Sequence, residues 1–175
     1  MSSSIRVIDD VVSDIYQKHI ENMMSSLEWY FEPSITFDHE IDPNSGFSNV
    51  IVDKFDKIRK GQTDFLLPLL YEGISKYDKG AKLKELYRIR AVMWIKNQNK
   101  GPHHPHCDLH IKHHTMVYYV NDTDAPTRLY KDNRVFKEVQ PKKGRALIFP
   151  GNTQHASASP TETSRRMVLN FNFLI

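Results

Sequence analysis

The chain has 175 residues, of which 39% are hydrophobic, and its 24 basic and 21 acidic residues leave a formal net charge of +3. A chain of this size buries about two-thirds of its unfolded surface, so its core needs no disulfide or structural metal. Its single cysteine, Cys107, excludes an internal disulfide and favours a reducing compartment. The sequence starts without a basic, apolar leader, and no apolar run approaches the ~20 residues of a membrane span. We therefore expect one cytoplasmic domain over residues 1–175, with no membrane partner.

The basic residues do not gather into a surface for nucleic acid. They alternate with acidic residues along most of the chain, and the densest basic stretches, at residues 142–145 and 165–166, are short. A nucleic-acid-binding surface concentrates such residues on one face. We therefore expect no nucleic-acid partner, and the sequence leaves the oligomeric state open.

Most of the helical signal lies in the N-terminal part, residues 1–80. Residues 5–8 predict a short strand before it. Ser13 is suited to cap a helix, and apolar residues then recur at helical spacing. This pattern predicts an amphipathic helix over residues 14–26.

Two further predictions cover the rest of this part. Residues 32–46 are rich in Pro, Asp, Asn and Ser and predict a loop that contains His39. Pro68 has the fixed backbone angle of a first helical turn, and apolar residues follow it on one face. A second helix is therefore predicted from residue 68 to residue 77, before Gly80.

From residue 84 onward the apolar pattern has the period of a β-strand. Residues 87–95 alternate between two differently populated faces. Further short strands, separated by Asn, Asp, Pro or Gly, are predicted at residues 116–120, 127–130, 135–139, 146–149 and 166–174. This pattern predicts a mainly β fold, in which residues 84–175 form a jelly-roll core, or double-stranded β-helix, and the two N-terminal helices buttress one sheet.

The residues that suggest chemistry are histidines. Six of the nine lie between residues 103 and 114. His106 and Asp108 are two residues apart, so on an extended strand both point to one face while Cys107 points away. His155 lies far along the chain, and a jelly roll brings distant strands together. Two histidines and one carboxylate leave three corners of an octahedron open, which is typical of a non-haem Fe(II) oxygenase site.

The surrounding strands add to this pattern. Residues 117–121 read Val-Tyr-Tyr-Val-Asn, and residues 165–173 close the chain with Arg-Arg and alternating apolar residues. From about Leu86 to its end, the sequence resembles the 2-oxoglutarate and Fe(II)-dependent dioxygenases, in particular the small prolyl-hydroxylase-like branch with bacterial and phage-encoded members. The resemblance implies Fe(II) and the cosubstrates 2-oxoglutarate and O2, with the iron held by His106, Asp108 and His155.

The same resemblance implies that Arg166, helped by Tyr119, binds the far carboxylate of 2-oxoglutarate. The strand period favours Arg166 over Arg165, because Arg166 shares a polar face with Asn170 and Asn172. The face of Arg165 is apolar enough to belong to the core. A guanidinium also binds a carboxylate through two parallel hydrogen bonds, which fixes its orientation.

The sequence also departs from the family. The Gly-Gly pair often found before the strand at 127–130 is replaced here by Ala125-Pro126, so substrate contacts there are not carried over. His104 and His106 are spaced like the start of a cupin metal site, but no glutamate follows before Glu138. We interpret the additional histidines either as solvated loop residues or as rim residues and substrate contacts of the site; they are His103, His104, His110, His113 and His114.

These observations predict a dioxygenase that hydroxylates a small-molecule or peptidyl substrate, for example a prolyl residue, with release of succinate and CO2. A cupin-like isomerase or lyase remains an alternative, and it predicts a fourth metal ligand and no role for Arg166. A nonenzymatic metal-binding barrel is the other alternative, and it predicts a damaged ligand set. Arg88 and Arg90 share one strand face and would hold an anionic or peptide backbone group if that face lines the mouth of the barrel.

Overall fold

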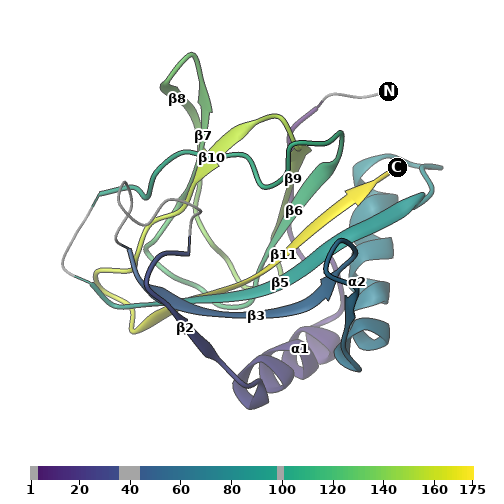
Figure 1. The fold of residues 1–175 in the computed structure, drawn as a ribbon, viewed down its shortest axis with the longest axis horizontal. Coiled ribbons are helices and arrows are strands. Elements are labelled where there is room, and N and C mark those ends of the chain that lie inside the picture. Colours follow the sequence, from purple (N-terminus) through teal and green to yellow (C-terminus); the bar gives the residue numbers. More distant parts are fainter. Residues whose placement is uncertain (1–3, 36–43, 98–100) are drawn as a thin grey trace.

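The computed structural model describes residues 4–35, 44–97 and 101–175, which form two β-sheets with two helices on one side (Figure 1). His39, in the predicted loop, lies outside the described residues. The elements in chain order are β1 (Arg6–Ile8), α1 (Asp14–Ser26), β2 (Tyr30–Glu32), β3 (Gly46–Asp53), β4 (Ile58–Arg59), α2 (Gln62–Tyr77), β5 (Glu85–Ile95), β6 (His114–Tyr119), β7 (Thr127–Lys131), β8 (Arg134–Val139), β9 (Ala146–Pro150), β10 (Gln154–Ala156) and β11 (Arg165–Leu174).

The strands pair antiparallel in two sheets. The larger sheet has the order β1-β9-β6-β11-β5-β3-β2, with β4 beside β3, and the smaller sheet has the order β10-β7-β8. Strands distant in sequence are neighbours, such as β11 between β5 and β6. The predicted double-stranded β-helix is therefore confirmed.

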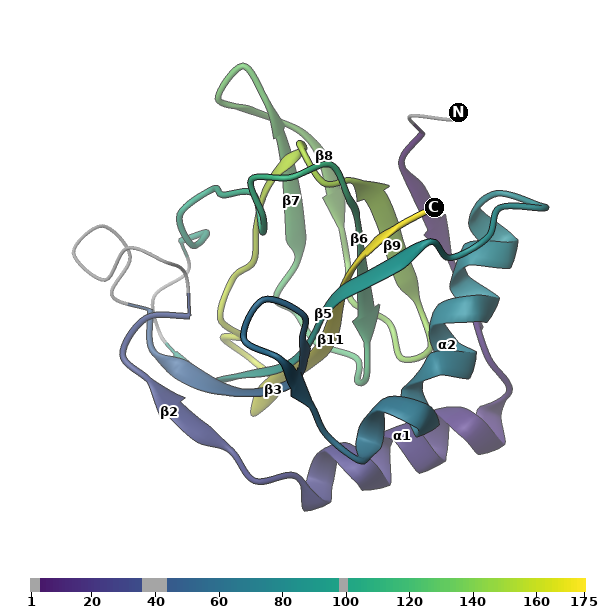
Figure 2. The ribbon, with the colours of Figure 1, turned by 45° about the vertical axis from the view of Figure 1, so that its right-hand side comes forward.

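The helices cover the outer face of the larger sheet, as Figure 2 shows from the side. Strand alternation divides the apolar residues between two cores. Met116 and Tyr118 in β6 pack in the core beneath the helices, whereas Val117 and Tyr119 pack between the two sheets. Full burial of an apolar side chain of this size contributes about 1.5–3 kcal/mol. The inner core surrounds the candidate site.

Helix α1 has the predicted bounds. The Ser13 side chain accepts a hydrogen bond from the backbone N–H of Tyr16 at 3.4 Å and caps the first turn. Ile20 and Met24 lie one turn apart and are fully buried. The helix is therefore stabilised both by its N-terminal cap and by the burial of its apolar face.

Helix α2 begins at Gln62, so the prediction that it begins at Pro68 is wrong. Pro68 lies inside the helix, where it leaves the Asp64 carbonyl without an intrahelical N–H partner and costs about 3 kcal/mol. Leu66, Leu69 and Leu70 are fully buried on either side of it. The free energy gained by burying these leucines offsets the cost of the proline, and the helix continues past Pro68.

Strands β2, β3, β4 and β10 are additions to the sequence-based prediction. The loop predicted over residues 32–46 overlaps the end of β2 and the start of β3. Strand β3 pairs with β5 and is buried at Ile51 and Val52. The run Val50-Ile51-Val52 does not alternate between polar and apolar residues, so the strand period is hidden there.

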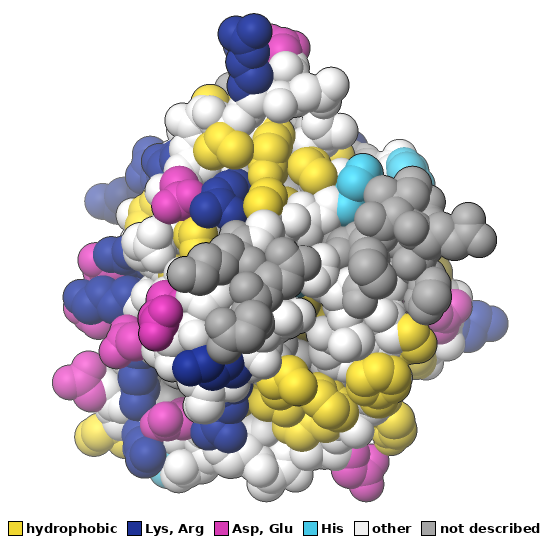
Figure 3. Space-filling view, turned by 90° about the vertical axis from the view of Figure 1, so that its left-hand side faces the viewer, with side chains coloured by type: hydrophobic (Ala, Val, Ile, Leu, Met, Phe, Trp, Pro, Cys, Tyr) yellow, Lys and Arg dark blue, Asp and Glu magenta, His cyan; other side chains and the backbone are white. Residues whose placement is uncertain are grey.

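The face shown in Figure 3 exposes hydrophobic side chains in two groups, above and below the residues that are not described. Phe31 in β2 is 61% exposed and Phe136 in β8 is 49% exposed. Each of these strands ends its sheet in the described part of the chain. Both aromatic side chains therefore lie at sheet edges and belong to neither core.

Candidate metal centre

His106 and His155 lie directly opposite each other. The backbone N–H of each donates to the carbonyl of the other, at 3.0 and 2.9 Å. The pairing is an isolated bridge between β10 and the segment before β6, rather than part of a long strand. Side chains of such a pair point to the same side of the ladder. The two imidazole centroids are accordingly 4.7 Å apart.

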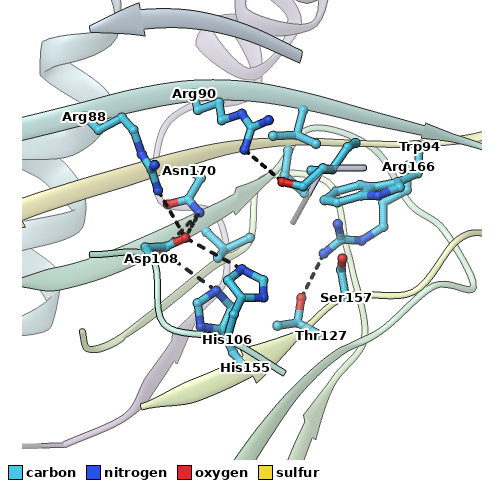
Figure 4. Close-up of a pocket in the computed structure, with 14 residues that line it drawn as sticks. Arg88, Arg90, Trp94, His106, Asp108, Thr127, His155, Ser157, Arg166 and Asn170 are labelled. Carbon is cyan, nitrogen blue, oxygen red and sulfur yellow. Dashed lines mark hydrogen bonds and ion pairs between the residues drawn. The ribbon is translucent and has the colours of Figure 1, made fainter. Parts of the chain in front are cut away.

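Asp108 completes the cluster. One ligand atom from each of His106, Asp108 and His155 lies within 4.8 Å of the others. The Nε2 atom of His106 is 4.0 Å from Asp108 Oδ1, and that of His155 is 3.8 Å from Oδ2 (Figure 4). In the described part of the chain no other group of three such side chains is found. Two imidazoles and a carboxylate fit Fe(II) and leave positions open for ligands.

Backbone carbonyls orient both imidazoles. The Nδ1 atom of His106 donates to the carbonyl of His104 at 3.1 Å, and that of His155 donates to Thr153 at 3.3 Å. A carbonyl only accepts, so each Nδ1 carries the proton and each Nε2 lone pair is free to bind a metal. Burial lowers the pKa of His155 to about 4. This imidazole is therefore neutral at neutral pH, as a metal ligand requires.

Asp108 is held by donors from three neighbouring strands. Arg88 in β5, Asn172 in β11 and Thr115 in β6 lie in one row across the larger sheet. They donate to the Asp108 carboxylate at 3.3, 2.9 and 3.0 Å, respectively. Asn170 adds contacts of 3.3 Å to both oxygens. This network fixes the carboxylate in the absence of any metal.

The surroundings of Asp108 also set its charge. Burial raises the pKa of this carboxyl. His155, which is charged at the low pH where Asp108 titrates, together with Arg88 and His106 outweighs that effect and brings the pKa below its usual range. Asp108 is therefore an anion at neutral pH.

Arg166 lies at the other end of the same cavity and is 1% exposed. Its Nε donates to the carbonyl of Ala125 at 3.1 Å, and its Nη2 donates to Thr127 Oγ1 at 2.9 Å. Its Nη1 is buried and has no hydrogen-bond partner. The Trp94 ring stacks near the guanidinium, 4.7 Å away. Burial lowers the pKa of Arg166 to about 10, so it is a cation with a free donor. An orphaned arginine donor in a cavity fits a carboxylate ligand such as 2-oxoglutarate.

Tyr119 lies behind Arg166. Its hydroxyl donates to Thr127 Oγ1 at 2.8 Å, and Arg166 lies 5.7 Å from its ring centre. Burial raises the pKa of Tyr119. Thr127 lines the cavity and Tyr119 does not. The direct role expected for Tyr119 therefore stays a prediction, and its contacts are with Thr127 and Arg166.

One cavity extends from the His106, Asp108 and His155 cluster to Arg166. Four alternate residues of β5, Arg88, Arg90, Val92 and Trp94, form one wall, as the strand period indicated. Its other lining residues are Ile35, His106, Asp108, Val117, Thr127, His155, Ser157, Arg166, Val168 and Asn170. Sequence reasoning missed Thr127 and Ser157, because small hydroxyl side chains give no local signal for a site.

The faces of β11 are arranged as predicted. Arg165 is exposed, and the residues that share its face, such as Leu169 and Phe171, are fully buried beneath the helices. Arg166, Val168 and Asn170 line the cavity instead.

The additional histidines do not line this cavity. His103 is buried, with its ring nitrogens 2.8 Å from Ser157 Oγ and 3.1 Å from Ser159 Oγ. His113 is also buried. The interpretation of these two residues as rim or solvated loop residues is therefore wrong, because tertiary packing encloses them. His104 and His110 are exposed. His114 is half-buried and begins strand β6, so its interpretation as a loop residue is also wrong.

Cys107 lines a different groove, together with Leu109 and His110. It therefore points away from the two ligand candidates beside it in sequence. Burial raises the pKa of its thiol, with Asp108 adding to the effect. The environment favours the unreactive thiol form.

A double-stranded β-helix with this His-Asp-His cluster and a buried arginine in one cavity defines the class of non-haem Fe(II) oxygenases. Residues 91–174 match the family model of the 2OG-Fe(II) oxygenase superfamily. The C-terminal part of the chain, residues 91–174, is thus similar to this superfamily, and the match indicates a 2-oxoglutarate-dependent dioxygenase that uses Fe(II), 2-oxoglutarate and O2.

Solved structures share the fold. A prolyl hydroxylase from Trichoplax adhaerens, in complex with a hypoxia-inducible-factor peptide, superposes with a TM-score of 0.66 at 13% identity, covering 98% of this chain and 84% of that one. A 2OG-Fe(II) oxygenase family oxidoreductase from Burkholderia pseudomallei has a TM-score of 0.71 at 13% identity, with 97% and 84% covered. The epimerase SnoN, in complex with Fe3+, α-ketoglutarate and nogalamycin RO, has a TM-score of 0.68 at 10% identity, with 98% and 79% covered.

Two further findings are negative. A search of curated protein sequences finds no match to the chain. Among the described residues, no helix has the length and apolar character needed to cross a membrane.

Proposed function

We propose that His106, Asp108 and His155 bind the Fe(II) of this dioxygenase and that Arg166 binds the distal carboxylate of 2-oxoglutarate. One observation carries the proposal. Three metal-binding atoms lie within 4.8 Å of one another in a cavity that also contains a buried arginine with a free N–H donor.

When bound, Fe(II) and 2-oxoglutarate supply the oxidising chemistry: O2 and 2-oxoglutarate yield succinate and CO2, and the second oxygen atom enters the substrate. The chain supplies binding and orientation. Arg88, Thr115 and Asn172 hold Asp108 in place before metal arrives. The carbonyls behind the imidazoles keep both Nε2 atoms directed at the ion.

Arg166 supplies the anchor for the cosubstrate. Its contacts with Ala125 and Thr127 fix the guanidinium, so Nη1 is already directed when the carboxylate arrives. A charge-assisted hydrogen bond at a buried site contributes about 1.5–3 kcal/mol. Trp94, Val92 and Val168 line the same cavity and reduce the access of water to it.

The substrate we propose is a peptide side chain or a small molecule. The Trichoplax hydroxylase holds a peptide and SnoN holds a small molecule in structures with the same fold. Hydroxylation of a prolyl residue and hydroxylation of a small metabolite are the two reactions that this proposal covers.

The proposal is tested by adding Fe(II) and 2-oxoglutarate to the protein without oxygen and recording the visible absorption band of the chelate. Oxygen is then admitted, and succinate is measured by mass spectrometry. We expect His155→Ala to lose both signals and the exposed His110→Ala control to keep both. Retention of full activity in His155→Ala, with its loss in His104→Ala, would show that the ligand set is misassigned.

A further inference from the structure

We propose that Arg90 binds an anionic group of the substrate, a carboxylate or a phosphate. This inference rests on the proposed function and names the substrate class of the same cavity. Arg90 lies on β5 two residues after Arg88, lines the cavity, and stands opposite Asn170 of β11 (Figure 4). It therefore lies in the same row as Asn170 and one row away from Arg88 and Asn172, which also hold Asp108.

The hydrogen bonds of Arg90 leave one edge of its guanidinium available. Its Nη1 donates to the carbonyl of Ile35 at 3.1 Å, which fixes the orientation of the group. Its Nε is buried and has no hydrogen-bond partner. The Nε and Nη2 donors point to the same side of a guanidinium, and this edge matches the two oxygens of a carboxylate or phosphate. The free edge is thus the one suited to an oxyanion.

The charges of the cavity lead to the same conclusion. Among the described lining residues, three arginines accompany one carboxylate, that of Asp108. Arg88 pairs with Asp108 at 3.3 Å. In the proposed function, Arg166 takes the distal carboxylate of 2-oxoglutarate, and Fe(II) is neutralised by Asp108 and the proximal carboxylate. Among the described residues that line the cavity, Arg90 is then left with no anion.

No ion pair of Arg90 is found among the described residues. Glu32 and Asp108 act on it only at longer range, and Glu32 accepts a hydrogen bond from Ser48. Burial lowers the pKa of Arg90, and the like charge of Arg88 lowers it further. Arginine nevertheless stays protonated in proteins, so a half-buried cation lines the cavity. Such a group favours an anionic ligand more strongly than a surface arginine does.

The test follows the arginine Nε–H signals by NMR in protein loaded with Zn(II), a redox-silent substitute for iron, and saturated with 2-oxoglutarate. The Arg90 signal is assigned by its absence in Arg90→Gln and, independently, in Arg90→Lys. Acetate, inorganic phosphate and acetamide are then titrated in. We expect the Arg90 signal to shift and saturate with acetate or phosphate and to stay in place with acetamide, while the Arg165 signal does not saturate with any of them.

Different signals report on the two proposals. The Arg166 signal should shift when 2-oxoglutarate is added, and its failure to do so would count against the proposed function alone. The Arg90 inference is overturned if its signal ignores both anions, if acetamide moves it equally, or if 2-oxoglutarate alone saturates it. The last outcome would make Arg90 part of the cosubstrate site.

Discussion

The two ends of the cavity differ in how their buried polar atoms are satisfied. Both oxygens of Asp108 receive hydrogen bonds from the protein itself. Arg166 Nη1, at the other end, and Arg90 Nε, on the β5 wall of the cavity, are buried without partners. A buried donor without a partner costs about 1–3 kcal/mol. The comparison indicates that the protein itself satisfies the Asp108 carboxylate, whereas these two arginine donors are left for the ligands that we propose.

The largest expected effect is at the metal end. Asp108→Asn keeps the shape of the side chain but removes the negative charge, so we expect Fe(II) binding and succinate formation to fall below detection. Metal affinity by calorimetry and succinate by mass spectrometry measure this. Asp132→Asn, in the turn between β7 and β8, is the control and should behave as the wild type. Undiminished iron affinity in a folded Asp108→Asn protein would remove Asp108 from the ligand set.

The next effect concerns the arginine end. Arg166→Gln removes a charge-assisted contact of about 1.5–3 kcal/mol, so the affinity for 2-oxoglutarate should fall roughly ten- to 150-fold. Calorimetric titration of 2-oxoglutarate into Zn(II)-loaded protein measures this. Arg165 is exposed and serves as the control, because Arg165→Gln should change the affinity for 2-oxoglutarate little. The reverse ranking would mean that β11 presents its other face to the cavity.

A smaller effect should follow from loosening the network around Asp108. Asn172→Ala leaves every proposed metal ligand intact but removes the 2.9 Å contact to Asp108. Metal affinity should fall about tenfold, at the lower end of the range for residues that position metal ligands. Co(II) titration measures this, with the exposed Asn152→Ala as control. Unchanged metal affinity would show that the carboxylate needs no such support.

The smallest effect is expected at Cys107. This residue lies between two proposed ligands in sequence but lines a separate groove. Cys107→Ala should keep its metal affinity within about twofold and lose about 1 kcal/mol of unfolding free energy or less. Metal titration and chemical denaturation measure both quantities. Loss of metal from a well-folded variant would overturn the ligand set.

The period-two pattern made much of the β-fold predictable. Alternation in β5 and β11 correctly separated the cavity face from the core face, including the choice of Arg166 over Arg165 as the residue facing inward. The start of α2 was predicted too late, because proline is common in the first turn of a helix. Here the burial of the leucines around Pro68 stabilises a helix that contains the proline in its interior. Strand β3 was missed because its apolar run lacks alternation.

The candidate site was only partly accessible from sequence. The short spacing of His106 and Asp108 is a local signal, but the donors around Asp108 come from three strands whose register is set by tertiary pairing. The unpartnered donors of Arg90 and Arg166 are likewise properties of the packed state. Sequence patterns identify which residue types lie on one face, and packing determines which of their atoms remain unpaired.

The backbone bridge between His106 and His155 has a consequence for unfolding. Because these residues are far apart in sequence and hydrogen-bonded to each other, an ion held by both side chains would close a loop on the order of 50 residues. Such a cross-link raises the cost of local opening where the edge of the smaller sheet meets the segment before β6. Amide hydrogen exchange at these two positions should therefore slow when metal is bound. Iron depletion would then loosen the two sheets from each other at the same place where it stops oxidation.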